Sequence, residues 1–239
     1  MRRITRFATS TLAAVIGLSS TVVMTPQTAE ALTTAQIRTA QTRLNYLGCN
    51  AGPVDGTIGM MTRAATVRFQ AVMKIAQTGT LDAPTVWRLG VSWRKRCDKR
   101  AVPSTSGGGR RMVVQQSQNW LWVIDSAGHV VAQGGIIDNP SVYGPGVYYT
   151  GPKCGKAARI KNNYTADGRL ILHNFVRYAA CGGGFHQIPI YRSTGLQIHP
   201  DYLLGTNYRE SHGCIRVSRA MSDVIWNFTT VSTRVVIVR

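Results

Sequence analysis

The pattern of apolar residues changes character in the middle of this 239-residue chain. Before residue 92 they recur at intervals of three and four, which is typical of amphipathic helices. After residue 110 they alternate or form short runs bounded by turn residues, which is typical of β-strands. Between them lies a basic and then Gly- and Ser-rich stretch that favours a flexible connection. We therefore expect an α+β chain of two domains, at residues 32–91 and 110–239, joined by a linker at 92–109.

The N-terminal domain is predicted to be a small unit of three helices. Thr33 or Thr34 can cap the first helix and Gly48 can end it, before the loop NAGPVDGTIG. The predicted apolar faces are Ile37, Ala40, Leu44 and Leu47 in the first helix, Met61, Ala65, Phe69 and Val72 in the second, and Val86 and Leu89 in the third.

The C-terminal domain is predicted to be rich in β-strands. Candidate strands are RMVVQQ, NWLWVID, HVVAQGGI, GVYYT, RLILHNFVRY, FHQIPIY and the final RVVIV. One late helix can begin after Ser218 and carry Met221, Val224, Ile225 and Phe228 on one face. This pattern predicts a sandwich or barrel-like β-domain with one helix packed on it.

Residues 1–31 have the features of a secretory signal peptide. Arg2, Arg3 and Arg6 form a basic start, an apolar run follows, and Ala29-Glu30-Ala31 offers a small-x-small exit. The apolar run is shorter than the roughly 20 residues that span a bilayer, so we expect no stable membrane span after cleavage. An uncleaved anchor is the alternative. We predict a secreted protein that acts outside the cytoplasm, at the cell wall.

The chain is strongly basic, with a net charge of +18. Removing residues 1–31, which hold three Arg and one Glu, leaves +16. Such a charge indicates polyanionic surroundings or a generally basic set of secreted proteins, and says little about the fold. Nucleic acid is not an expected partner, because no aromatic and basic binding motif is evident. A wall with acidic polymers fits the predicted compartment better.

Five cysteines in an exported chain leave one without a partner. Four cysteines allow three pairings, and we expect Cys49–Cys97 and Cys154–Cys181, because each pair then stays within one predicted domain. Cys214 remains, either as an intermolecular link or as a reactive thiol.

The remaining thiol lies in the stretch Ser211-His212-Gly213-Cys214-Ile215-Arg216. A thiol reacts as the thiolate, which needs a nearby cation, base or dipole, and cysteine catalysis pairs it with an imidazole. Gly213 allows a sharp turn, and the amides of Gly213 and Cys214 could point at a developing oxyanion. Arg216 could bind a carboxylate.

This stretch resembles the signature of the L,D-transpeptidase catalytic domain, Ser/Thr-His-Gly-Cys-apolar-Asn or Arg, and the resemblance extends over about residues 110–239. An upstream histidine belongs to the signature. We assign it to His186 in GGGFHQIPIYRSTG. Twenty-four residues separate His186 from Ser211, whereas many relatives have a shorter spacing. His199, with 11 residues before Ser211, is the alternative. The stretch YRSTGLQIH is expected to carry His199 outward to the surface, His173 is expected to be structural, and His129 exposed.

The resemblance implies a cysteine-dependent acyltransferase of cell wall biogenesis and cell shape, without a cofactor. Cys214 would attack the third residue of a tetrapeptide stem, with His186 as general base and acid and Gly213 as an oxyanion amide. An amine acceptor would give 3–3 cross-links in peptidoglycan, and water would give L,D-carboxypeptidase trimming. His212 would support the loop, while Ser211 and Arg216 would bind substrate. Carbapenem-type inhibitors are expected to acylate the thiol.

The helical unit resembles peptidoglycan-binding domains of the three-helix kind. The matching stretches are QTRLNYLGCNAGPVDGTIGMMTRAATVRFQ and TGTLDAPTVWRL. The resemblance implies a groove for wall stem peptides. Asp55-Gly56 and Gly59 are expected to shape a turn and Phe69 to fill the core, so no ligand contact is assigned.

Three other interpretations of the SHGC stretch remain open. Cys214 could be an ordinary buried thiol in a turn. His186, His199, His212 and Cys214 could bind zinc in a stem peptidase, although no HExxH motif is present. The chain could also be an inactive wall-binding protein.

Overall fold

The structure is a computed structural model that describes residues 31–92 and 94–239. The predicted signal peptide, residues 1–31, lies outside the described residues except for Ala31. Residues Leu32–Arg239 form one compact unit. Within the described ranges, no helix combines the length and the apolar character needed to cross a bilayer.

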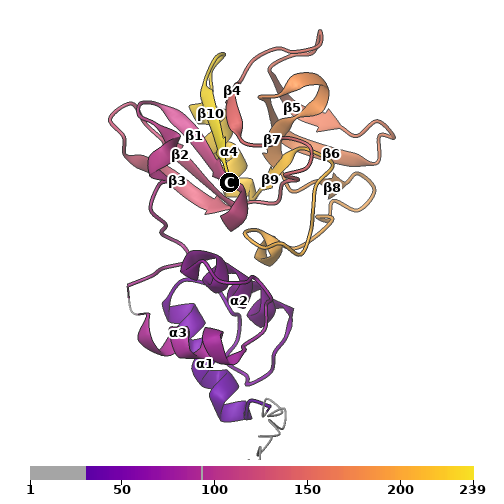
Figure 1. The fold of residues 1–239 in the computed structure, drawn as a ribbon. Helices are drawn as coiled ribbons and strands as arrows, with labels where there is room; N and C mark the ends of the chain where they lie inside the picture. The colour runs from indigo at the N-terminus through magenta and orange to yellow at the C-terminus, as the bar shows by residue number, and fades with distance from the viewer. Residues whose placement is uncertain (1–30, 93) are drawn as a thin grey trace, which may run out of the picture. The chain divides into compact units, whose positions relative to one another are not determined.

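Three helices form the N-terminal part of this unit, as predicted (Figure 1): α1 (Thr34–Tyr46), α2 (Met60–Met73) and α3 (Ala83–Val91). Thr33 and Gln36 form a capping box at the start of α1, and Asp82 caps α3 by accepting a hydrogen bond from the Thr85 amide. The core between the helices includes Leu44, Leu47, Ala65, Phe69, Leu81 and Leu89.

Two buried glutamines shape the loops of the helical part. The Gln41 amide group donates to Asp55 Oδ1 and accepts from the Gly56 amide, at 2.8 and 2.9 Å. Gln70 accepts from the Gly79 amide at 2.9 Å and donates to the Thr85 hydroxyl. Each side chain therefore satisfies buried backbone groups in a turn. The predicted turn at Asp55-Gly56 is present, with Gly56 at φ 80°, and Phe69 fills the core.

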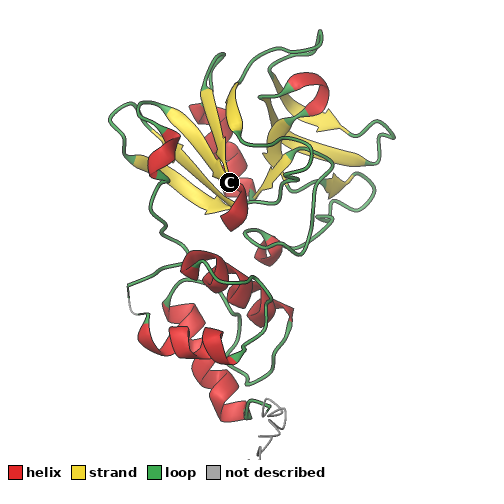
Figure 2. Cartoon of the chain, viewed as in Figure 1, coloured by secondary structure: helices red, strands yellow, loops and turns green. Residues whose placement is uncertain are grey.

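The C-terminal part contains two five-stranded sheets (Figure 2). The first has the order β3-β2-β1-β10-β4 and comprises β1 (Arg111–Gln115), β2 (Trp120–Ile124), β3 (Val130–Gly135), β4 (Gly146–Tyr149) and β10 (Arg234–Val238). The second has the order β5-β6-β7-β9, with β8 pairing β6, and comprises β5 (Arg159–Tyr164), β6 (Leu170–Arg177), β7 (Gly184–Gln187), β8 (Ile190–Tyr191) and β9 (Ile215–Val217).

One hydrophobic core joins both sheets to α4 (Arg219–Phe228). Met112 and Val235 enter it from the first sheet, Phe185 and Ile215 from the second, and Ile225 from the helix. Ser218 caps α4 by accepting a hydrogen bond from the Met221 amide, as predicted. The α+β fold, with three N-terminal helices and one helix packed on a β-rich domain, is therefore confirmed.

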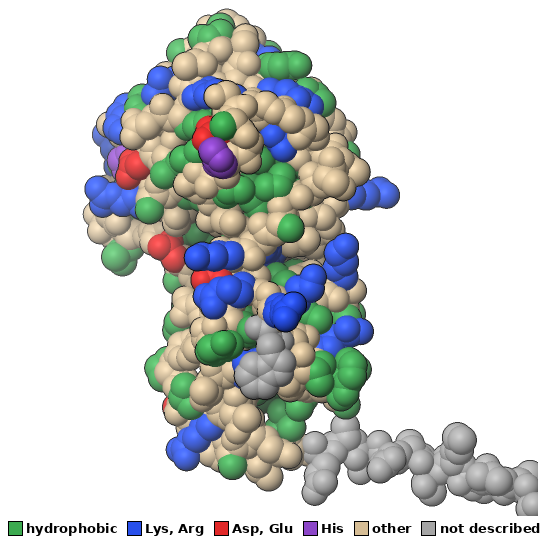
Figure 3. Space-filling model, turned by 90° about the vertical axis from the view of Figure 1, so that its left-hand side faces the viewer, with side chains coloured by type: hydrophobic (Ala, Val, Ile, Leu, Met, Phe, Trp, Pro, Cys, Tyr) green, Lys and Arg blue, Asp and Glu red, His purple; other side chains and the backbone are tan. Residues whose placement is uncertain are grey.

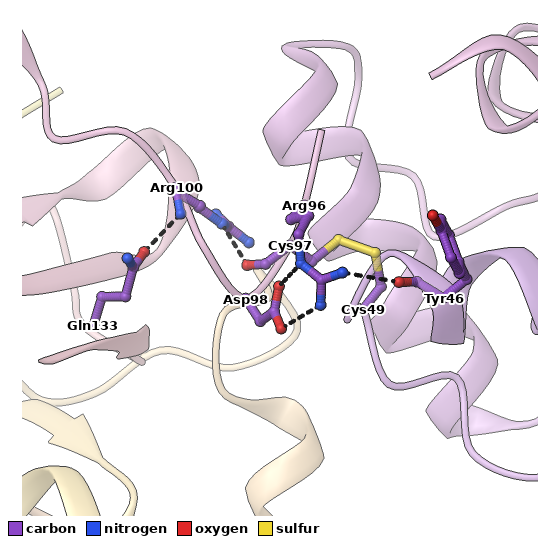
Figure 4. Close-up of polar contacts among 7 residues, drawn as sticks. All are labelled: Tyr46, Cys49, Arg96, Cys97, Asp98, Arg100 and Gln133. Carbon is purple, nitrogen blue, oxygen red and sulfur yellow. Dashed lines mark hydrogen bonds and ion pairs between the residues drawn. A yellow bond between two sulfur atoms is a disulfide. The ribbon is translucent and has the colours of Figure 1, made fainter. Parts of the chain in front are cut away.

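The segment expected to be a linker is fixed at several points (Figure 4). Cys97 forms the predicted disulfide with Cys49, and its amide donates to the Leu47 carbonyl. The Arg100 amide donates to Gln133 Oε1 at 2.7 Å, and the indole of Trp122 donates to the Arg100 carbonyl. The later Gly107–Gly109 stretch is held as well, because the Gly108 and Gly109 carbonyls accept hydrogen bonds from the guanidinium groups of Arg234 and Arg111.

Cys154 is disulfide-bonded, so it is not a second reactive thiol. The side chain of its expected partner, Cys181, lies outside the described part of the chain. The pairing Cys154–Cys181 therefore stays a prediction.

A buried arginine on α2 connects the helical part with the segment that leads to the SHGC stretch. The Arg68 guanidinium donates to the carbonyls of Tyr202 and Leu204, at 2.6 and 3.0 Å. It also donates to the carbonyls of Cys49 and Asn50. Burial without a carboxylate partner lowers the pKa of Arg68 to about 10. Four carbonyl dipoles thus take the place of a counter-ion.

Candidate active site

Two short parallel strands position the residues predicted to be catalytic. In the β7–β9 pair, Phe185 lies opposite Ile215 and His186 opposite Arg216. Because Phe185 and Ile215 point into the core, His186 and Arg216 share the other face of the sheet. Cys214 comes directly before β9, level with the start of β7. The fold therefore places the predicted nucleophile and the predicted base on neighbouring strands.

Cys214 is a free, partly buried thiol. Its Sγ donates to the Gly182 carbonyl at 3.2 Å. Burial raises the pKa of the Cys214 thiol above its ordinary value, and this effect outweighs the Gly184 amide and the charges of Arg216 and Arg177, which favour the thiolate. The resting group is therefore a thiol at neutral pH, close to groups that stabilise its anion.

His186 is a buried, neutral imidazole. Only 2% of the residue is exposed, and its ring stacks on Phe175 with centroids 6.2 Å apart. Burial, and secondarily the charge of Arg216, lowers the pKa of His186 to about 4. Its Nδ1 lies 2.5 Å from the Gln187 carbonyl oxygen, so Nδ1 carries the proton. The lone pair is consequently on Nε2, the arrangement that a proton acceptor requires.

Ser211 braces the loop that carries Cys214, the predicted nucleophile. It is 3% exposed, its amide donates to the Asp138 carbonyl, and its carbonyl accepts from Asn139 Nδ2. Its hydroxyl accepts from the Gly213 amide at 3.0 Å. In this structure the Ser211 hydroxyl and the Gly213 amide therefore satisfy each other. The predicted substrate contact of Ser211 and the oxyanion role of Gly213 stay predictions.

Gly213 needs to be glycine for two independent reasons. Its φ of 122° is a conformation that residues with a Cβ rarely adopt, and a Cβ built there would lie 2.8 Å from Val142 Cγ1. Val142 and Tyr143 belong to the turn after Asp138, and the Tyr143 hydroxyl donates to the Ala180 carbonyl at 3.0 Å. This turn packs directly against the SHGC loop.

The expectation that His199 lies on the surface is wrong. His199 is 5% exposed, and its Nε2 is buried without a hydrogen-bond partner. The residues before it pack back onto the domain, since the Ile198 amide donates to the Pro189 carbonyl and Ile198 joins a cluster around Ile188. Burial lowers the pKa of His199 as well. Its Nδ1 lies 3.2 Å from the Pro200 carbonyl oxygen.

The other predicted residues occupy different settings. His212 is exposed, whereas Arg216 is partly buried, which lowers its pKa. His129 is exposed and lies near Asp125, and His173 lies 2.7 Å from Asn162 on the neighbouring strand. Arg216 electrostatically affects both His186 and His199, so its positive charge lies near both rings.

Sequence analysis missed two buried charged groups near the site. Arg177, at the end of β6, is 2% exposed, donates to the Ala157 carbonyl and favours the Cys214 thiolate. Asp138 accepts from Gln116, and burial raises the pKa of its carboxyl. Neither belongs to a local motif. The sequence signal for Arg177 is a charged residue at the end of an apolar strand, in NFVRY, where a buried arginine is not ordinarily expected.

The zinc interpretation is not supported by the geometry of the described residues. In the two ranges that the structure describes, no three His, Cys, Asp or Glu side chains gather into a group that could hold a metal ion.

Two family models match the chain. The model for the L,D-transpeptidase catalytic domain matches residues 111–237, which is more than half of the chain. The model for a peptidoglycan binding domain matches residues 33–89. No curated protein matches the chain at a significant level.

Several solved structures are similar to this chain. An L,D-transpeptidase (residues 123–326) from Xylanimonas cellulosilytica is 19% identical, with a TM-score of 0.50, over 90% of this chain and 98% of that one. An L,D-transpeptidase from Stackebrandtia nassauensis is 17% identical, with a TM-score of 0.43, over 89% and 95% of the two chains. The catalytic domain of the Enterococcus faecium L,D-transpeptidase, acylated by ertapenem, is 16% identical, with a TM-score of 0.39, over 55% and 98%.

The match over residues 111–237 covers both strands of the β7–β9 pair, the free thiol and the SHGC loop that Ser211 braces. The N-terminal match adds a wall-binding module to the same chain, which associates its action with the cell wall, outside the cytoplasm. The chain belongs to the L,D-transpeptidase family and is a peptidoglycan L,D-transpeptidase with an N-terminal peptidoglycan-binding domain.

Proposed function

We propose that this protein forms 3–3 cross-links in peptidoglycan through a thioester on Cys214, with His186 as general base and acid. The observation that carries the proposal is the parallel pairing of β7 with β9, which places the free thiol of Cys214 directly before one strand and His186, with its Nε2 lone pair, on the neighbouring strand. Residues 1–31 are proposed to direct export and to be removed.

The resting pair consists of two neutral groups. The pKa of Cys214 is raised and that of His186 is lowered, both chiefly by burial, so the thiolate–imidazolium ion pair is disfavoured before substrate binds. The thiol proton then moves to His186 Nε2 as Sγ attacks the stem carbonyl. Such coupling confines the reactive thiolate to the moment of attack.

The proposed reaction has two halves. Sγ bonds to the carbonyl carbon of the third stem residue, and the C–N bond to the terminal D-alanine breaks as His186 returns the proton to the leaving amine. The side-chain amine of a second stem then attacks the thioester, passes its proton to His186 and releases the thiol. Water in place of the amine gives the L,D-carboxypeptidase reaction.

The oxyanion is proposed to bind the amides of Cys214 and Gly213. The Gly213 amide donates to the Ser211 hydroxyl in the free enzyme. When the oxyanion forms, the Gly213 amide exchanges its hydrogen bond to the Ser211 hydroxyl for a stronger one to the charged oxygen. This exchange favours the tetrahedral intermediate over the ground state. Arg216 is proposed to bind a stem carboxylate and His212 to support the loop.

The helical domain offers a groove for the wall. A groove of about 910 Å³ lies between α1 and α3 and is lined by Arg38, Thr39, Tyr46, Val86 and Leu89, among others. Tyr46, which lines the groove, exposes 60% of its surface and so offers an accessible aromatic ring. We propose that wall stem peptides bind here.

The deciding experiment incubates the protein from residue 32 onward with disaccharide-tetrapeptides and identifies the products by mass spectrometry. We compare the wild type with Cys214→Ala and with the matched pair His186→Asn and His199→Asn. Asparagine can keep a donor directed at the neighbouring carbonyl while removing the imidazole Nε2. The proposal expects cross-linked dimer from the wild type and His199→Asn, and a loss of at least about 100-fold in His186→Asn. Dimer formation by Cys214→Ala would overturn it.

A further inference from the structure

A strongly basic cleft lies away from Cys214, which is not among its described lining residues. It has a volume of about 630 Å³ and runs along the segment between residues 94 and 105. Six cationic side chains line it: Lys74, Arg94, Lys95, Arg96, Lys99 and Arg100. None of its described lining residues is Asp or Glu. Arg96 pairs with Asp98, and among the described residues none of the other five cations forms an ion pair.

One of these cations is buried and incompletely bonded. Arg100 is 7% exposed, and its guanidinium stacks on Trp120 at 3.9 Å. Its Nε donates to the Cys97 carbonyl and its Nη1 to the Gln118 carbonyl, but its Nη2 is buried without any partner. Burial, and secondarily the charge of Arg68, lowers the pKa of Arg100 to about 9. A buried N–H that lacks an acceptor is costly unless a ligand supplies one.

The segment that presents the cations is held in place before any ligand arrives. The Cys49–Cys97 disulfide anchors its first half, and Gln133 Oε1 accepts a hydrogen bond from the Arg100 amide (Figure 4). The Trp122 indole donates to the Arg100 carbonyl. Preorganised groups lose little entropy on binding. The backbone of the segment is held, but the side chains of Lys95 and Lys99 are exposed at the cleft. Lys and Arg side chains are more frequent than Asp and Glu on the face drawn in Figure 3.

We propose that this cleft binds the phosphodiester groups of an anionic cell-wall polymer. The Arg100 guanidinium offers its free N–H to one phosphate oxygen, and Lys74, Arg94, Lys95 and Lys99 neutralise successive charges along the chain. A repeating anion fits better than a single ion, because the cations extend over the whole cleft. Single-stranded nucleic acid fits less well, since no described lining residue is aromatic and could stack on bases.

This site would act independently of Cys214. Binding of a wall polymer near residues 94–100 would keep the enzyme in the wall alongside the peptidoglycan groove, and two linked contacts raise the effective affinity for the same wall. Acylation of Cys214 is therefore expected to be unaffected by changes in the cleft.

The test measures binding of the protein from residue 32 onward to a labelled glycerol phosphate oligomer by fluorescence anisotropy, over a series of salt concentrations. Lys95→Glu/Lys99→Glu reverses two exposed charges of the cleft. Lys156→Glu/Arg239→Glu reverses two exposed charges elsewhere and is the matched control. We expect the cleft variant to lose at least about tenfold in affinity, and the slope of log K against log salt to fall by about 2. The control should lose much less.

Arg100→Lys tests the specific guanidinium. It keeps the charge and removes the unused N–H, so it should weaken oligomer binding with little change in the salt slope, provided that its thermal unfolding resembles that of the wild type. Equal loss of affinity in the cleft and control variants would overturn the proposal. Tighter binding of single-stranded DNA or of anionic lipid vesicles through the same lysines would overturn it as well. Carbapenem acylation of Cys214, followed by intact mass, is measured on every variant.

Discussion

His186 on β7 lies directly opposite Arg216 on β9, in parallel register. This pairing brings a permanent positive charge beside the proposed base, two residues along the chain from Cys214, the proposed nucleophile. The cation disfavours protonation of His186 and favours the thiolate of Cys214. Burial is the main reason that the imidazole of His186 stays neutral; Arg216 adds to this effect and also favours ionisation of the Cys214 thiol.

The thiol of Cys214 should react slowly at neutral pH and faster as the pH rises. Because burial raises its pKa, the alkylation rate with iodoacetamide should keep increasing beyond the ordinary cysteine pKa of about 8.5. Arg216→Gln removes a charge that favours the thiolate, so its profile should shift to higher pH, whereas Arg216→Lys should shift it less. A plateau of reactivity below neutral pH would contradict this electrostatic description.

His186 should make the fold less stable in mild acid. Its folded pKa of about 4 lies below the unfolded value of about 6.5, so the unfolded chain binds the proton more readily. The contribution is fully present above about pH 6.5 and is lost as the pH falls towards about 4, for a total of ~3 kcal/mol. Urea unfolding across this range should show the loss in the wild type. The decrease in the free energy of unfolding should be smaller in His186→Asn. An equal pH dependence of stability in the two proteins would refute the assignment of this effect to the low pKa of His186.

Arg68 should contribute strongly to stability although it makes no ion pair within the described residues. Arg68→Ala removes the donor from four backbone carbonyls, so we expect a decrease of roughly 3 kcal/mol in the free energy of unfolding. Arg63→Ala, at an exposed position on the same helix, is the control and should change stability by less than about 0.5 kcal/mol. Similar unfolding midpoints for the two variants would show that the carbonyl contacts contribute little.

Gly213→Ala should slow acylation without abolishing the fold. The added Cβ approaches Val142 and imposes a strained φ, so the loop has to shift and the rate should fall by on the order of tenfold or more. Val142→Ala/Gly213→Ala relieves the contact but not the backbone strain, so it should recover only part of the rate. The measurement is the rate of carbapenem adduct formation by intact mass. Full recovery in the double variant would assign the whole effect to the contact.

Local sequence patterns were sufficient to predict the helices and the free thiol. Capping residues and apolar spacing predicted α1 and α4, and the odd cysteine count predicted the free thiol at Cys214. These features depend on residues close in sequence. The parallel pairings of β1 with β10 and of β7 with β9 join distant segments, so no local pattern specifies them.

The burial of individual polar residues was the least predictable feature. His199 is buried because the preceding loop packs back onto Ile188, which is a tertiary effect. Arg68 and Arg100 are buried because backbone carbonyls happen to surround them, whereas an arginine in a sequence is ordinarily expected on the surface. The bond between the Gly213 amide and the Ser211 hydroxyl likewise depends on the conformation of the loop, not on its composition.

The central claim is that Cys214 carries the acyl group during catalysis. The most direct measurement mixes the protein with a tetrapeptide stem in the absence of an acceptor, quenches in acid and maps the modified peptide by tandem mass spectrometry. The account predicts a tripeptide acyl group on Cys214 in the wild type and its strong reduction in His186→Asn. An acyl group on any other residue, or product formation by the wild type without any thioester at Cys214, would contradict it.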